Sequence, residues 1–231
     1  TGAHNTGIGR NALLSNTTAN YNTAVGAASL DANTTGFSNT ASGYAALGAN
    51  TSANYNAAFG VYALQNTTTG ANNTASGYGA LLSNTTGCRN TAIGLAAGRN
   101  HTTGCRNTYI GVNAGCGASS ATAKLNTASG YSALRFISSG SEDTAHGYDA
   151  LYANTTGCRN TAVGMQALKT NTTANDNTAV GACSLYANTT GADNTAVGFR
   201  ALKANTTANY NAAFGNYALQ ANTTGGGNTC L

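Results

Sequence analysis

The side chains of this sequence that could carry out catalysis or bind a metal are few and scattered. The 231 residues include six acidic side chains, three histidines and six cysteines. Glu142 and Asp143 are adjacent, but neither has a histidine or a nucleophile at a fixed spacing. The sequence also lacks a C-x-x-C pair and a G-x-x-x-x-G-K-[ST] loop. We therefore expect a protein that is not an enzyme and that holds no metal or cofactor.

Two of the cysteines have a spacing that favours a disulfide. Cys88 and Cys105 each lie in the string T-G-C-R-N, 17 residues apart. If 17 residues make one coil of a stacked structure, the two cysteines lie about 4.8 Å apart on neighbouring coils. Disulfides accept such a Cα separation. We predict a Cys88–Cys105 disulfide and an oxidising location. The alternative is that the cysteines fill small buried or half-buried positions.

Asparagine side chains in N-x-[ST] sequences are candidate glycosylation sites. They are Asn16, Asn33, Asn50, Asn66, Asn72, Asn84, Asn100, Asn154, Asn171, Asn188, Asn205 and Asn222. One interpretation is that glycans coat the protein. The other is structural, because stacked asparagine amides can hydrogen-bond along a ladder. The asparagine that opens each repeat forms an acceptor sequence only through overlap, which favours a structural first asparagine and an exposed, modifiable twelfth.

These residues belong to a repeat of 17 residues, N-T-A-V-G-x-x-A-L-x-x-N-T-T-G-x-x, as in residues 177–193. Its glycine recurs at Gly9, Gly26, Gly43, Gly60, Gly77, Gly94, Gly111, Gly130, Gly147, Gly164, Gly181, Gly198 and Gly215, with one step of 19 residues. A fixed short period indicates a solenoid. Stretches of four to six residues between the turn signals are too short for stable helices and suit strands. The absence of proline suits ladder pairing, and a constant phase argues against a disordered tract.

We therefore predict an all-β fold, a parallel β-solenoid of about thirteen 17-residue coils and roughly 60 Å in length. Alanine at the third position and leucine at the ninth, as in Leu168, indicate a narrow core. Where the fourth position holds a small side chain, such as Ser42, the sixth holds a tyrosine, such as Tyr44. Residues two apart on a strand share a face. Because that face tolerates such changes in size, we place it outside the core.

The repeat predicts one domain over residues 1–231, with an irregular coil near 112–129. Residues 1–74 match 156–229 at an offset of 155 residues, and the chain begins and ends within a repeat. We expect it to be a piece of a longer protein. The net charge is +4 and no basic stripe with interleaved aromatic residues is visible, so nucleic acid is not an expected partner. No run of 18 apolar residues occurs, so no membrane span is expected.

The repeat resembles those of bacteriophage tail fibres and of trimeric autotransporter adhesin heads, over essentially the whole chain. Its glycine follows the asparagine by four positions (Asn177 to Gly181), where the adhesin-head unit has five. The resemblance implies an extracellular fibre or adhesin shaft at a cell or virion surface. We expect a structural rod whose partners are copies of itself, joined end to end or laterally, with glycans as a further covalent partner. One alternative is an ice-binding solenoid with a threonine file that includes Thr178. Another is a carbohydrate-binding adhesin that uses tyrosines as stacking platforms.

Overall fold

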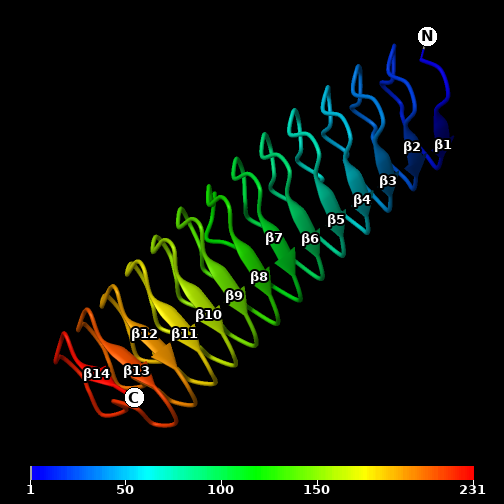
Figure 1. Ribbon diagram of the computed structural model, residues 1–231. Coiled ribbons are helices and arrows are strands. Elements are labelled where there is room, and N and C mark those ends of the chain that lie inside the picture. The colour runs from blue at the N-terminus through cyan, green and yellow to red at the C-terminus, as the bar shows by residue number, and fades with distance from the viewer. Residues whose placement is uncertain (1) are drawn as a thin grey trace. The chain divides into compact units, whose positions relative to one another are not determined.

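The computed structural model describes residues 2–231, and in these residues the chain forms short strands and turns without a helix. Each repeat contributes one strand of two or three residues (Figure 1). The strands are β1 (Thr6–Ile8), β2 (Thr23–Val25), β3 (Thr40–Ser42), β4 (Ala57–Phe59), β5 (Thr74–Ser76), β6 (Thr91–Ile93), β7 (Thr108–Ile110), β8 (Thr127–Ser129), β9 (Thr144–His146), β10 (Thr161–Val163), β11 (Thr178–Val180), β12 (Thr195–Val197), β13 (Ala212–Phe214) and β14 (Thr229–Cys230).

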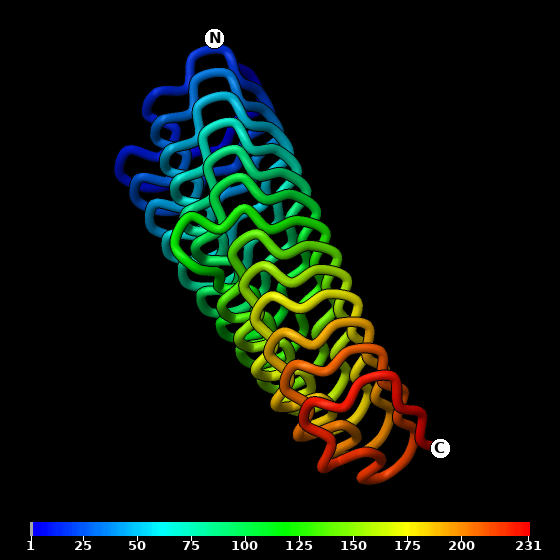
Figure 2. Tube along the Cα trace, turned by 90° about the vertical axis from the view of Figure 1, so that its left-hand side faces the viewer, coloured from blue at the N-terminus to red at the C-terminus, as the bar shows by residue number. Residues whose placement is uncertain are grey.

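The chain divides into two compact units. The N-terminal unit extends to Asn113 and includes Ser119–Thr122, and the C-terminal unit comprises Ala114–Ala118 and Ala123–Leu231. Within each unit, successive strands pair in parallel and in chain order, with each residue opposite the one 17 positions later. The coils of each unit lie one upon the next (Figure 2). The predicted fold, an all-β parallel β-solenoid of about thirteen 17-residue coils, is confirmed.

The strands are shorter than the sequence predicts, because most of each coil consists of turns. Three positions of the repeat, the seventh, ninth and seventeenth, have a left-handed backbone, as in Gln166, Leu168 and Asp176. The coils are nevertheless hydrogen-bonded around their circumference. For example, Leu168 N donates to Ser184 O at 3.0 Å, and Asp176 N donates to Cys158 O at 3.1 Å. Backbone pairing between coils therefore extends well beyond the strands.

The recurring glycine is required by the close approach of neighbouring coils. Gly164 has a φ of 132°, and a Cβ added there would lie 2.7 Å from the carbonyl carbon of Gly181. Only glycine adopts this backbone readily. The 17-residue glycine period thus marks the place where one coil rests directly on the backbone of the next.

The core of each coil contains alanine, leucine and asparagine. Ala162 and Leu168 are fully buried, like their equivalents in most coils. The N-terminal unit contains a pair of substitutions in this pattern that compensate for one another. Gly98 replaces the leucine, and Tyr109 replaces the alanine of the next coil; the Tyr109 side chain is completely buried. A Cβ on Gly98 would lie 2.9 Å from the Tyr109 ring, so the tyrosine occupies the volume that leucine fills elsewhere.

The irregular segment after β7 is divided between the two units, and each part is hydrogen-bonded within its own unit. In the N-terminal unit, Thr102 N donates to Ala121 O at 2.9 Å, and Ala121 N donates to Asn100 O at 3.0 Å. In the C-terminal unit, Ala118 N donates to Ile137 O at 2.8 Å. The repeat with two additional residues therefore retains coil-to-coil hydrogen bonds within each unit.

Candidate functional site

The candidate glycosylation sites form an internal ladder in most coils. Seven of them are fully buried at the twelfth position, namely Asn33, Asn50, Asn84, Asn154, Asn171, Asn188 and Asn205. The Asn171 amide nitrogen donates to Asn154 Oδ1 at 3.1 Å and to Ala174 O at 3.1 Å, and Asn188 continues the ladder. This nitrogen is the atom that would carry a glycan. The expectation that the twelfth asparagine is exposed is therefore wrong for these seven residues.

The remaining candidates are more accessible. Asn16, Asn100 and Asn222 are half-buried, whereas Asn66 and Asn72 are exposed. Asn66 lies at the eleventh position because its repeat is out of phase by one residue, and Thr67 occupies the ladder position instead. Asn72 lies at the seventeenth position, where the backbone is left-handed. Glycosylation remains a prediction, and among the twelve residues these two are the best placed for it.

The first asparagine of the repeat is structural, as its position outside the acceptor pattern indicates. Asn177 Oδ1 accepts a hydrogen bond from Asn194 N at 3.1 Å, and the Asn177 amide nitrogen donates to Gly191 O at 2.9 Å. The twelfth-position Asn188 donates to the same Gly191 oxygen at 2.8 Å. The two ladders therefore meet at one carbonyl group and fix the corner of the coil.

In one coil the asparagine at the first position of the repeat is replaced by an acid, Asp143. Asp143 is buried, and its Oδ1 accepts hydrogen bonds from Asn160 N at 2.8 Å and from the Asn160 amide at 3.1 Å. Asn154 donates to the other carboxyl oxygen at 2.9 Å. Burial raises the pKa of Asp143 to about 7, although these hydrogen bonds oppose the shift. The site therefore changes charge near neutral pH.

The two cysteines predicted to pair lie side by side as thiols. Cys88 Sγ is 2.8 Å from Cys105 Sγ, which also accepts a hydrogen bond from Cys88 N at 3.0 Å. The hydrogen bond between the thiols, followed by burial, raises the pKa of Cys88. A disulfide bond is about 2.05 Å long, so no such bond is present, and its formation remains a prediction.

The outer face of the strands is made mainly of threonine and of small or apolar side chains. In β2, β3 and β10, for example, Thr and Val or Ser point outward while the alanine between them is buried. The fourth position is thus outside the core, as predicted: Val25 is 38% exposed and Phe59 is 44% exposed. The strands of the described chain contain no lysine, arginine, aspartate or glutamate.

A further surface has no counterpart in the sequence analysis. The tenth positions of five successive coils hold a cation or a tyrosine in alternation: Arg135, Tyr152, Lys169, Tyr186 and Lys203. We call these residues the cation–tyrosine file. The expectation that no basic stripe with interleaved aromatic residues exists is therefore wrong. The residues are 17 positions apart in the chain, so only a tabulation by repeat position would reveal them.

No cluster of three or more potential metal ligands occurs among residues 2–231. The same residues include no helix long and apolar enough to cross a bilayer. Comparison with protein-family models, with curated proteins and with solved structures gives no match.

Proposed function

We propose that this chain is a structural repeat rod of an extracellular filament, fibre or adhesin shaft, and that it does not catalyse a reaction. The observation that carries the proposal is the bonding between coils, which recurs along each unit from the strands to the turns. A structure built in this way resists separation of its coils along the stack. Its length also scales with the number of repeats.

The composition of the core supports a structural role. Alanine, leucine and the asparagine ladders fill most of the interior. An extracellular location is supported by Cys88 and Cys105, which are close enough to couple under oxidising conditions. Asn66 and Asn72 supply exposed acceptor positions for glycans.

The spacer role is tested by removing complete repeats. Deletion of residues 160–210 removes three repeats and preserves the register of the flanking coils. It should shorten the maximum dimension in small-angle scattering by about 14 Å and leave the melting temperature nearly unchanged. A large loss of stability would show that the coils do not act as interchangeable spacers.

Copies of the chain are the partners that a filament requires. Electron micrographs and light scattering of the purified protein should show particles much larger than the 22.9 kDa chain. A monodisperse monomer at high concentration would contradict the filament.

Glycans would appear as mass above 22.9 kDa in protein from its native source. Peptide mapping should place them on Asn66 and Asn72. A glycan on the buried Asn171 would contradict the ladder described above.

Ice binding is a second candidate function, favoured by the outer face of the strands. Thr161, Thr178 and Thr195 form a regular file there, and they neighbour Val163, Val180 and Val197 on the same face. Purified protein with this function would show thermal hysteresis, and replacement of Thr178 by lysine would reduce it. Absence of thermal hysteresis in the intact chain would exclude this candidate.

A further inference from the structure

We propose that the cation–tyrosine file binds an acidic polysaccharide that carries one anionic group on every second sugar. The proposal goes beyond a structural role and does not depend on it. It is based on five side chains of the C-terminal unit and on the groove that two of them line.

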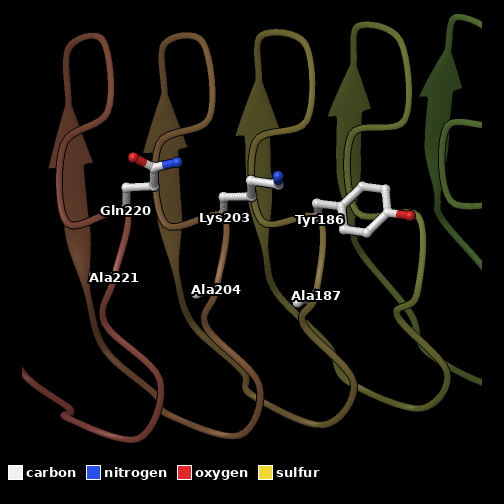
Figure 3. A pocket seen from close by; sticks show the side chains of 6 residues that line it. All are labelled: Tyr186, Ala187, Lys203, Ala204, Gln220 and Ala221. Atoms are coloured by element: carbon white, nitrogen blue, oxygen red, sulfur yellow. The ribbon is translucent and has the colours of Figure 1, made fainter.

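Two residues of the file, Tyr186 and Lys203, line a groove of about 450 Å³. Tyr186, Lys203 and Gln220 line one side of the groove, together with a row of alanines on the adjacent position of the same three coils (Figure 3). Small side chains at these alanine positions keep the groove open.

The cations of the file are held in place by aromatic rings. Lys169 Nζ lies 5.6 Å from the centre of the Tyr152 ring, and Lys203 Nζ lies 5.9 Å from that of Tyr186. The Arg135 guanidinium lies 5.6 Å from the Phe136 ring, which packs edge-on against Tyr152 at 5.0 Å. These contacts reduce the freedom of the long cationic side chains before a ligand arrives.

The charge of the file remains positive. Asp149 pairs with Lys169 at 3.0 Å, and this hydrogen bond raises the pKa of the lysine, which therefore stays protonated. Among the three cations of the file, only Lys169 has an ion pair with a carboxylate of residues 2–231.

The spacing of the file selects a polymer with a matching repeat. Adjacent coils are about 4.8 Å apart, so the cations recur about every 10 Å. An extended polysaccharide advances by nearly one coil spacing per sugar. A chain with alternating acidic and neutral sugars would place each anion opposite a cation and each neutral ring against a tyrosine. Phosphates of a B-form nucleic acid strand recur about every 3.4 Å, which does not match this interval.

The N-terminal unit shows that the solenoid does not require these side chains. The positions matched to Lys169, Tyr186 and Lys203 by the 155-residue offset are Leu14, Asp31 and Gly48. The same fold is built there without alternating cations and tyrosines. The side chains of the file are therefore not needed to hold the coils together, and they are available for binding a ligand.

The proposal is tested with hyaluronan oligosaccharides, which carry one carboxylate per disaccharide, and the full chain. We expect binding that weakens as salt is added. Lys203→Gln, which breaks no ion pair in the structure, should reduce the affinity by about ten-fold, and Lys169→Gln/Lys203→Gln should reduce it further. Tyr186→Leu, which introduces the side chain that Leu14 supplies at the tenth position of an N-terminal coil, should also weaken binding.

The matched control is Arg89→Gln/Arg106→Gln, which removes two charges from the N-terminal unit. It should leave the affinity unchanged. All variants are compared only after thermal melting shows that they fold. The proposal is overturned if hyaluronan does not bind, if the control loses as much affinity as the double variant of the file, or if a neutral dextran binds equally well. Tighter binding of oligodeoxythymidylate would overturn it in favour of a nucleic acid.

Discussion

The acid in the asparagine ladder makes the stability of the C-terminal unit dependent on pH. Asp143 has a pKa of about 7 in the folded chain, against an ordinary value of 3.8. A raised carboxyl pKa means that folding favours the neutral form, so the stabilisation is complete below about pH 4 and is lost as the pH rises to 7. Each pKa unit corresponds to about 1.4 kcal/mol. The unfolding free energy should therefore decrease by about 4 kcal/mol across this interval.

Replacement of Asp143 by asparagine should remove this dependence. Neighbouring coils have asparagine at the position of Asp143. The side-chain oxygen of Asn160, for example, accepts a hydrogen bond from Asn177 N in the next coil at 3.1 Å. Its amide nitrogen donates to Ala174 O at 2.9 Å. A protonated carboxyl group can reproduce both bonds, but an ionised one cannot donate. The variant should match the parent near pH 4 and exceed its stability by up to about 4 kcal/mol at pH 8.

The assay is denaturant unfolding at pH 4, 6 and 8, together with hydrogen exchange of the Asn160 amide, because repeat proteins can open locally. Asp193→Asn is the control, since Asp193 is an exposed acid at the seventeenth position. Other titrating groups are common to both proteins and cancel in the difference. If the unfolding free energies of variant and parent differ by the same amount at pH 4 and at pH 8, Asp143 is not a neutral buried acid.

Three further predictions concern the core, the glycine contact and the thiol pair. Leu168→Ala should cost about 2–5 kcal/mol in unfolding free energy because the side chain is fully buried, whereas Met165→Ala, at a position 51% exposed, should cost below about 0.5 kcal/mol in denaturant unfolding. Gly60→Ala should lower the melting temperature, because its Cβ would lie 2.7 Å from the Gly77 oxygen; an unchanged temperature would show that the coils separate easily. Mild oxidation should couple Cys88 to Cys105, as shown by intact mass and resistance to alkylation, and should stabilise the chain by about 3 kcal/mol; free thiols after oxidation would contradict this pairing.

The sequence predicts the repeating coil and its core because both depend on period and side-chain size. The glycine period indicates where coils touch, and the constant size at the third and ninth positions identifies the interior. The length of the strands is harder to predict from the sequence. Leu168 has a φ of 50°, a backbone that leucine rarely adopts, and no local pattern indicates it. The left-handed positions limit the strands to two or three residues and bend the rest of the coil into turns.

The environment of the asparagines could not be predicted for a related reason. An N-x-[ST] sequence is a local feature, whereas the burial of Asn171 depends on how the turns direct its side chain toward the coil interior. Asn66 differs from Asn171 only by a shift of one position, and that shift places it outside. Distinguishing the two requires the phase of each asparagine within its own repeat.

The contrast between the two units indicates where function can reside in such a fold. The inward positions and the glycine contact are nearly constant in both units, because each coil must fit onto the next. The tenth position is not constrained in this way, since it accepts leucine, aspartate and glycine in one unit and lysine and tyrosine in the other. A solenoid converts any such variation into a file with one side chain per coil, spaced about 4.8 Å apart. Its recognition surfaces are therefore lines rather than clusters, and the ligands that fit them best are polymers whose own repeat matches that spacing.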